Sequence, residues 1–135
     1  MEKTYFRKIL LIDDSPEFSS MFGKFLKRHG YEVSKAQDGL EGLEKARLEK
    51  PDLIILDVML PGMNGHKVCR MIKFDQQLKK IPVLVLTARM SEDDEQLAFQ
   101  CGADAFIVKG TENNAILAEL KKLLRQSIDN HLEAT

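Results

Sequence analysis

The sequence contains no tryptophan, few prolines, only two cysteines and almost no net charge. Its 20 lysines and arginines stand against 21 aspartates and glutamates, so no global field attracts nucleic acid or an anionic membrane. The longest aliphatic runs, such as residues 9–12, are far shorter than the roughly 20 residues of a membrane-spanning helix. We therefore expect neither a membrane span nor direct binding to nucleic acid, and any electrostatic function must be local.

Two further absences concern the compartment and the metal chemistry. Residues 1–8 lack the continuous apolar region of a secretory signal, which predicts a cytoplasmic protein. Cys69 and Cys101 form neither a Cys-x-x-Cys nor a His-rich spacing, so we expect reduced cysteines that pack as small apolar residues. None of the three histidines falls at the end of an apolar run. We expect all three at the surface: His29, His66 and His131.

Short apolar runs alternate with longer amphipathic segments along the chain. The apolar runs predict strands over Lys8–Asp13, Tyr31–Ala36, Leu53–Asp57, Pro82–Thr87 and Ala105–Lys109. The segments between them predict helices, the first capped by Ser15 and ended by Gly30, the others over Leu40–Lys50, His66–Phe74, Glu92–Cys101 and Glu112–Leu132. Five strands, each followed by a helix, indicate an α/β fold in which helices cover both faces of one parallel sheet.

We expect a single domain over residues 1–135, with a folded core of about 8–126. The last predicted helix has about 21 residues, above the average of 11 or 12, so its final turns are expected to protrude. An apolar stripe in the first helix recurs at helical spacing and predicts core packing rather than a cofactor site. Its members are Phe18, Met21, Phe22, Phe25 and Leu26.

Polar side chains collect at the predicted carboxyl ends of four strands. Asp13 and Asp14 follow the first strand, Asp57 the third, Thr87 the fourth and Lys109 the fifth. In a parallel sheet these ends share the edge where ligands bind. A single polar residue there is readily explained as a turn former, but five together indicate a site.

Three converging carboxylates repel one another unless a cation shares their site. Oxygen ligands alone suit Mg²⁺ better than Zn²⁺, which prefers histidine and cysteine. The ammonium of Lys109 and the hydroxyl of Thr87 beside such an ion form a pocket for a phosphoryl group. The carboxylate of Asp57 can accept that group as an aspartyl phosphate.

Four segments carry a resemblance to a known family: Leu11-Ile12-Asp13-Asp14-Ser15, residues 56–65 (LDVMLPGMNG), Leu86-Thr87-Ala88 and Val108-Lys109. Together they resemble the receiver domain of two-component response regulators over about residues 8–126. This resemblance implies a doubly wound (βα)5, flavodoxin-like, three-layer sandwich with strand order 2-1-3-4-5. It also implies a phosphorylation-activated signalling switch and not a metabolic enzyme, since the only reactions expected are its own phosphorylation and dephosphorylation.

The resemblance assigns the metal and the phosphoacceptor. Asp57 is the expected phosphoacceptor, supplied by a sensor histidine kinase, a phosphotransfer protein or a small phosphodonor. Asp14, Asp57 and the backbone carbonyl of Met59 are the expected Mg²⁺ ligands, with Asp13 contributing through a water molecule. We also hypothesise that the side chains of Met59 and Arg89 restrict water at the phosphoryl group and lengthen its lifetime.

The resemblance also assigns the switch. Lys109 is expected to pair with the phosphoryl oxygens, Thr87 to move toward phosphorylated Asp57, and Phe106 to turn inward behind it. The downstream protein target is then expected on the face made by the fourth helix, fifth strand and fifth helix, and phosphorylation-dependent dimerisation stays open. The sequence departs from the family at Gly110, where proline behind a cis bond is usual.

Three alternatives remain open from the sequence. The chain could be the receiver segment of a larger response regulator or hybrid histidine kinase, although the few residues beyond the folded core favour an output in another molecule. A haloacid-dehalogenase-like phosphatase also uses an aspartate nucleophile but needs Asp-x-Asp, whereas Met59 lies two residues after Asp57 and Ser15 two after Asp13. An FMN carrier needs a phosphate loop rich in serine, threonine and glycine, whereas residues 13–17 carry three acidic side chains.

Overall fold

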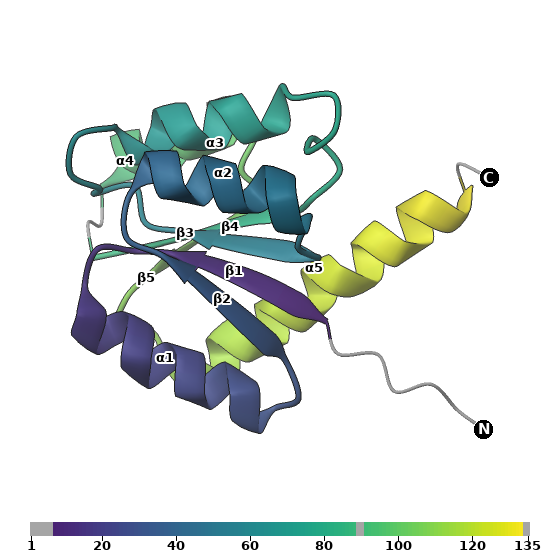
Figure 1. The fold of residues 1–135 in the computed structure, drawn as a ribbon, viewed down its shortest axis with the longest axis horizontal. Helices are drawn as coiled ribbons and strands as arrows, with labels where there is room; N and C mark the ends of the chain where they lie inside the picture. The colour runs from purple at the N-terminus through teal and green to yellow at the C-terminus, as the bar shows by residue number, and fades with distance from the viewer. Residues whose placement is uncertain (1–6, 89–90, 134–135) are drawn as a thin grey trace.

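A computed structural model describes residues 7–88 and 91–133, with the backbone alone for residues 128–133. The described residues form five strands and five helices in strict alternation (Figure 1). The strands are β1 (Lys8–Ile12), β2 (Glu32–Ala36), β3 (Leu53–Leu56), β4 (Val83–Thr87) and β5 (Ala105–Val108). The helices are α1 (Pro16–Arg28), α2 (Gly39–Glu49), α3 (Gly65–Lys73), α4 (Glu92–Gln100) and α5 (Asn113–Glu133).

The five strands form one parallel sheet in the order β2-β1-β3-β4-β5. Figure 1 shows α1 and α5 against one face of the sheet and α2, α3 and α4 against the other. The predicted flavodoxin-like three-layer sandwich is therefore confirmed. The strand order reverses between β1 and β3, which makes the carboxyl ends of these two strands the expected place for a ligand.

The sheet separates two hydrophobic clusters. Because successive strand residues point to opposite faces, β1 contributes Leu10 and Ile12 to one cluster and Ile9 and Leu11 to the other. Complete burial of one such aliphatic side chain stabilises the fold by about 1.5–3 kcal/mol. The two clusters thus hold the strand ends, and the residues that follow them, in a defined arrangement.

Side-chain caps begin the helices that leave the carboxyl edge of the sheet. The hydroxyl of Ser15 accepts a hydrogen bond from the Phe18 N–H at 3.3 Å, as predicted for the start of α1. Asn64 accepts one from the His66 N–H at the start of α3. Such caps satisfy N–H groups that lack a partner within the helix and contribute about 1 kcal/mol each. They fix where each loop of this edge ends.

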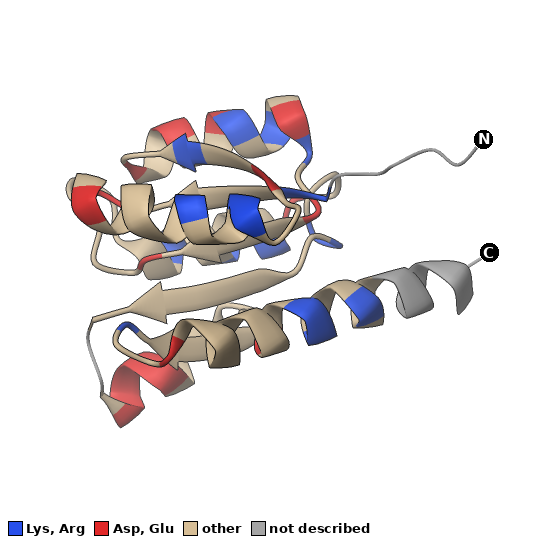
Figure 2. Cartoon of the chain, turned by 90° about the horizontal axis from the view of Figure 1, so that it is seen from below, with Lys and Arg blue, Asp and Glu red and all other residues tan. Residues whose placement is uncertain are grey.

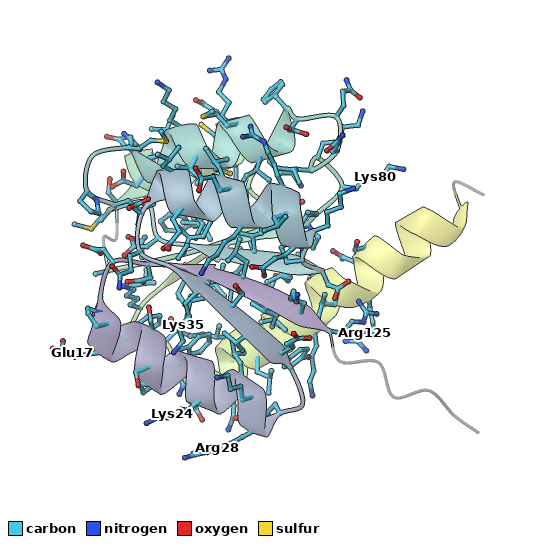
Figure 3. The ribbon with its side chains drawn as sticks, viewed as in Figure 1. Glu17, Lys24, Arg28, Lys35, Lys80 and Arg125 are labelled. Carbon is cyan, nitrogen blue, oxygen red and sulfur yellow. The ribbon has the colours of Figure 1, made fainter. Side chains whose placement is uncertain are left out.

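The apolar stripe of α1 packs in the core, as its spacing predicted, except at one position. Phe22 and Leu26 are fully buried, and Phe18 and Phe25 pack against the same cluster half-buried, whereas Met21 is exposed. The opposite face of α1 is polar, and Figure 3 shows charged side chains that point from it away from the sheet: Glu17, Lys24 and Arg28. The helix therefore presents its aromatic rings toward the hydrophobic cluster on this face of the sheet.

The last helix, α5, contains 21 residues and its final turns project beyond the amino end of the sheet (Figure 1), so its predicted length is confirmed. Its buried residues are Ile116, Leu117, Leu120, Leu123 and Leu124. The side chain of Ile128 lies outside the described residues. None of the described helices is both long enough and apolar enough to cross a bilayer.

Candidate functional site

The sheet brings two aspartates side by side. Ile12 and Leu56 are partners in the parallel register of β1 and β3, so the residues that follow them, Asp13 and Asp57, leave the sheet together. The N–H of Asp57 still donates to the carbonyl of Ile12 at 3.0 Å, and that of Asp13 donates to the carbonyl of Ala36 at 3.0 Å. Both backbones are therefore held at the switch point of the sheet, just beyond the strands to which we assigned them.

The predicted acidic cluster is present. One carboxylate oxygen each of Asp13, Asp14 and Asp57 lies within 4.8 Å of the others; Asp13 and Asp57 are buried and Asp14 is exposed. Asp57 Oδ1 accepts a hydrogen bond from the Met59 N–H at 2.9 Å, and Asp13 Oδ1 accepts one from the Ser15 N–H at 2.8 Å. Each buried carboxylate thus has one oxygen held by the backbone and the other directed to a different partner.

That partner is Lys109, which arrives from the end of β5. Its Nζ lies 2.7 Å from Asp13 Oδ2 and 3.0 Å from Asp57 Oδ2, and its backbone N–H donates to the carbonyl of Thr87 at 2.8 Å. The described residues contain no cis peptide bond, so the bond from Lys109 to Gly110 is trans. One ammonium therefore bridges the two buried carboxylates.

Burial and pairing act in opposite directions on these charges. Burial raises the pKa of Asp13 above its ordinary value, although hydrogen bonds from Lys109 and from the Ser15 N–H oppose this effect. Burial lowers the pKa of Lys109, but its hydrogen bonds to Asp13 and Asp57 outweigh burial and leave the pKa raised. Lys109 therefore stays cationic at neutral pH. A further positive charge nearby would stabilise the ionised carboxylates of the cluster.

The oxygens of this cluster suit a hard divalent cation. Carboxylates are the ligands that Mg²⁺ prefers, together with retained water, and the exposure of Asp14 leaves one side of the cluster open to solvent. Burial raises the pKa of Asp13 because it disfavours the ionised carboxylate, and a nearby cation would stabilise that ionised form. Asp13, Asp14 and Asp57 are thus chemically able to hold Mg²⁺.

The predicted switch residues lie on neighbouring strands. Thr87 is the last residue of β4 and fully buried, beside Val108 in the register of β4 and β5. Phe106 on β5 is half-buried and packs against the cluster under α4. It also lines a hollow of about 380 Å³ between β5 and the start of α4. Their movement on phosphorylation stays a prediction.

Of the two residues predicted to cover the phosphoryl group, the structure describes one. Met59 lies two residues after Asp57, and its side chain is exposed. Its N–H holds Asp57, as given above, while metal binding by its carbonyl stays a prediction. Arg89 lies outside the described residues.

His66 departs from the sequence prediction. We expected it at the surface, but it is buried, with Nε2 3.4 Å from Asp94 Oδ1 in the acidic first turn of α4, drawn red in Figure 2. The prediction was wrong because α4 covers the start of α3. A local signal existed, since His66 lies one turn before the buried Cys69 on the same helix face. His29 is exposed, as predicted, and the side chain of His131 lies outside the described residues.

The cysteines are free and buried, which confirms their predicted role as apolar packing residues. The Cys69 thiol lies 3.7 Å from the carbonyl oxygen of Cys101, and burial raises the pKa of Cys69 to about 12. A thiol with so high a pKa is a poor nucleophile at neutral pH. The chemistry of the molecule is therefore concentrated at the aspartate and lysine cluster.

One contact at this cluster was missed by the sequence analysis. The ring of Phe18, which we assigned to the core, lies beneath the ammonium of Lys109, with 4.4 Å between Nζ and the ring centroid. The helical stripe alone carries no signal for this contact, because the first turn of α1 and the residue that follows β5 meet only in the folded chain.

Comparison with known proteins places this geometry in a family. The family model of the response regulator receiver domain matches residues 9–121. The chain is 42% identical over 121 residues to the alkaline phosphatase synthesis transcriptional regulatory protein PhoP of Bacillus subtilis, covering 90% of this chain and 50% of PhoP. It is 32% identical to Protein PilH of Pseudomonas aeruginosa, covering 87% of this chain and 97% of PilH. The chain spans about half the length of PhoP and of the other transcriptional regulators that it matches.

Solved structures agree with this assignment. A CheY-like response regulator receiver domain protein from Methanospirillum hungatei has a TM-score of 0.88 and 25% identity, covering 93% of this chain and 99% of that chain. The chemotaxis response regulator CheY4 of Vibrio cholerae has a TM-score of 0.82 and 34% identity, covering 88% of this chain and 99% of that chain. These matches also set aside the phosphatase and the FMN carrier. The chain therefore belongs to the response regulator receiver domain family of two-component signalling proteins.

Proposed function

We propose that this receiver accepts a phosphoryl group on Asp57 in a Mg²⁺-dependent reaction. The observation that carries the proposal is the arrangement of Lys109, whose ammonium lies 2.7 and 3.0 Å from Asp13 and Asp57 within a cluster of three carboxylates. The donor is a phosphohistidine of a sensor kinase or phosphotransfer protein, or a small phosphodonor such as acetyl phosphate. The same residues match the motifs through which the chain resembles its family.

The chemistry follows from the way Asp57 is held. The Met59 N–H fixes Oδ1, and Oδ2 faces Lys109, so the carboxylate is oriented before the donor arrives. An oxygen of Asp57 attacks phosphorus, and the bond from phosphorus to the donor nitrogen or oxygen breaks. Asp14, Asp57 and the Met59 carbonyl, with Asp13 through a water molecule, would hold Mg²⁺, which would supply positive charge to the phosphoryl oxygens. Lys109 supplies the second positive charge.

The proposed response to phosphorylation runs through β4 and β5. The hydroxyl of Thr87 hydrogen-bonds the phosphorylated side chain, and Phe106 turns inward behind it. The hollow between β5 and α4 offers the space in which this face changes shape. The altered face of α4, β5 and α5 then binds a downstream protein or a second copy of the chain, because the new acceptor oxygens favour one arrangement over the other.

We infer that residues 1–135 act as one receiver module, with a core of 8–126, in the cytoplasm. The match to nearly the whole of PilH supports a receiver whose output lies in a partner protein. A second candidate is a receiver segment of a longer regulator or hybrid histidine kinase, which is favoured by the half-length match to PhoP and by a similar receiver from a histidine kinase of Syntrophus aciditrophicus. Asp57 has the same role in both.

The test is incubation with Mg²⁺ and acetyl phosphate, followed by intact mass and gel filtration. We expect one added phosphoryl group on the wild type and on Asp93→Asn, a control at an exposed carboxylate of α4, and none on Asp57→Asn. A wild type that takes no phosphate, or an Asp57→Asn variant that takes as much as the wild type, contradicts the proposal. Omitting Mg²⁺ should abolish the added mass.

A further inference from the structure

We propose that Phe18 is a positioning residue for Lys109: its ring supports the ammonium and holds it against the acidic cluster. The Nζ of Lys109 lies 4.4 Å above the ring centroid while it contacts Asp13 and Asp57. A cation over an aromatic face is attracted by the negative face of the ring, more strongly where water is excluded. The importance of this contact for phosphoryl transfer rests on the function proposed above.

The hydrogen bond from the Lys109 N–H to the Thr87 carbonyl fixes where this side chain begins but not where its ammonium lies. The next residue is Gly110, with φ +101° and no atom within 4 Å of the position that a Cβ would take. The Thr111 N–H donates to the Val108 carbonyl at 3.1 Å, so the backbone is held on both sides of this glycine. The four-carbon stem of lysine, in contrast, has many rotamers. The side-chain contacts of Lys109 therefore decide where its ammonium lies.

Phe18 is suited to this role because the first turn of α1 holds it rigidly. Its N–H donates to the Ser15 side chain, while the Ser15 N–H donates to the Asp13 carboxylate. One short segment thus fixes both a carboxylate and a ring that Lys109 contacts. This segment couples the geometry of α1 to that of the phosphoacceptor.

The ring of Phe22 braces Phe18 from behind, whereas Phe25 contacts Phe22 and not Phe18. Its ring lies 5.4 Å from that of the fully buried Phe22 at an interplanar angle of 13°, and Phe22 lies 5.7 Å from Phe25 at 25°. Stacked aromatic rings restrict one another's rotation and add to the burial energy. Core packing alone would need only an apolar side chain at position 18, whereas support of Lys109 needs a ring.

The first test is a double-mutant cycle on stability, which requires no phosphodonor. We expect Phe18→Leu to raise the unfolding equilibrium constant about two- to fivefold more when Lys109 is present than in the Lys109→Met background. Phe25→Leu, which removes a ring from the same stack, should show no such coupling. Equal costs of Phe18→Leu in both backgrounds would overturn the proposal.

A second measurement covers the case in which a Lys109 variant fails to fold. Protons above a ring face shift upfield in NMR spectra, so the ε-methylene protons of Lys109 should be shifted in the wild type and in Phe18→Tyr. The shift should vanish in Phe18→Leu and persist in Phe25→Leu. Unshifted protons in the wild type would contradict the contact.

Phosphorylation by acetyl phosphate with Mg²⁺ then tests the consequence. Phe18→Leu should slow the reaction about two- to fivefold, Phe18→Tyr should restore it, and Phe25→Leu should leave it unchanged. If Phe18→Leu and Phe25→Leu slowed the reaction equally, Phe18 would act only through core packing, which would contradict the proposal. A wild type that takes no phosphate but shows the coupling and the shifted protons would refute the proposed function and leave the support of Lys109 standing.

Discussion

Two lysines lie at opposite ends of the sheet, and each faces two carboxylates. At the amino end, Lys8 Nζ lies 3.8 Å from both Glu32 and Glu49, and its side chain is 30% exposed. At the carboxyl end, Lys109 Nζ lies 2.7 and 3.0 Å from Asp13 and Asp57, and its side chain is 17% exposed. Similar residue types thus form two different kinds of ion pair.

The difference lies in what water can reach. The Glu32 side chain is 59% exposed, so solvent screens its pair with Lys8 and the pair adds little to stability. The side chains of Asp13 and Asp57 are only 1% and 5% exposed, so their charges are costly to bury and depend on Lys109 or another cation. Such a cluster is weak evidence for a stabilising role and strong evidence for a functional one.

The largest expected effect is on phosphoryl transfer. Lys109→Met removes the positive charge facing Asp57, and we expect the rate of phosphorylation by acetyl phosphate to fall about 100-fold, the scale of losing one oriented charge donor. Lys8→Met makes the same change at the amino end and should leave the rate unchanged. Equal rates for the wild type and Lys109→Met would erase the contrast between the two ends.

The next effect concerns glycines at the two ends. A Cβ on Gly65 would lie 2.3 Å from Val58 Cα and 2.6 Å from the Asp57 carbonyl oxygen. Because these atoms are backbone, Gly65→Ala must displace the loop after Asp57, and we expect it to lower the free energy of unfolding by about 2–3 kcal/mol.

Gly30 provides the matched substitution at the other end. It has φ +91° but open space around it, so Gly30→Ala meets only backbone strain of about 1 kcal/mol. Urea denaturation of both variants measures the difference. If Gly30→Ala lowered the free energy of unfolding more than Gly65→Ala, the loop after Asp57 would have moved at little cost, which would contradict the prediction.

The pH dependence of stability should also single out the carboxyl end. Burial raises the pKa of Asp13 above its ordinary 3.8, so the native state holds this proton more tightly than the unfolded chain. The stability from this group is therefore present below pH 3.8 and is lost as the pH rises through the native value. In buffer without Mg²⁺, Asp13→Asn should remove this loss, as measured by denaturation from pH 3 to 7.

Mg²⁺ provides the control for that experiment. A cation that binds the native cluster should raise the stability of the wild type at neutral pH, and it should raise that of Asp13→Asn less. A wild type whose stability does not respond to Mg²⁺ would contradict a metal site at these aspartates.

The smallest expected effect is on the exposed pairs. Lys8→Met should change the free energy of unfolding by less than about 0.5 kcal/mol, and added salt should make this change smaller. Denaturation at low and high ionic strength measures it. If the free energy of unfolding fell by more than about 2 kcal/mol, buried charges would depend on Lys8 as they do on Lys109.

Much of the fold could be predicted because its signals are local. The apolar runs marked all five strands, and Ser15 and Gly30 marked the ends of α1. The spacing of His66 from Cys69 gave only a weak local signal for its burial, because that burial is completed by α4, which meets α3 only in the folded chain. The isomer of the bond before Gly110 likewise came only from the structure.

Sequence alone was enough to predict the alternation of strands and helices, the collection of Asp13, Asp57 and Lys109 at strand ends, and the resemblance to receivers. These features depend on residue type and spacing along the chain. The folded structure was needed to show that Lys109 bridges two buried carboxylates while Lys8 pairs with carboxylates that water reaches, and that Phe18 lies beneath Lys109. The physical reason is that charge pairing depends on burial and distance, and both are set by how distant elements pack.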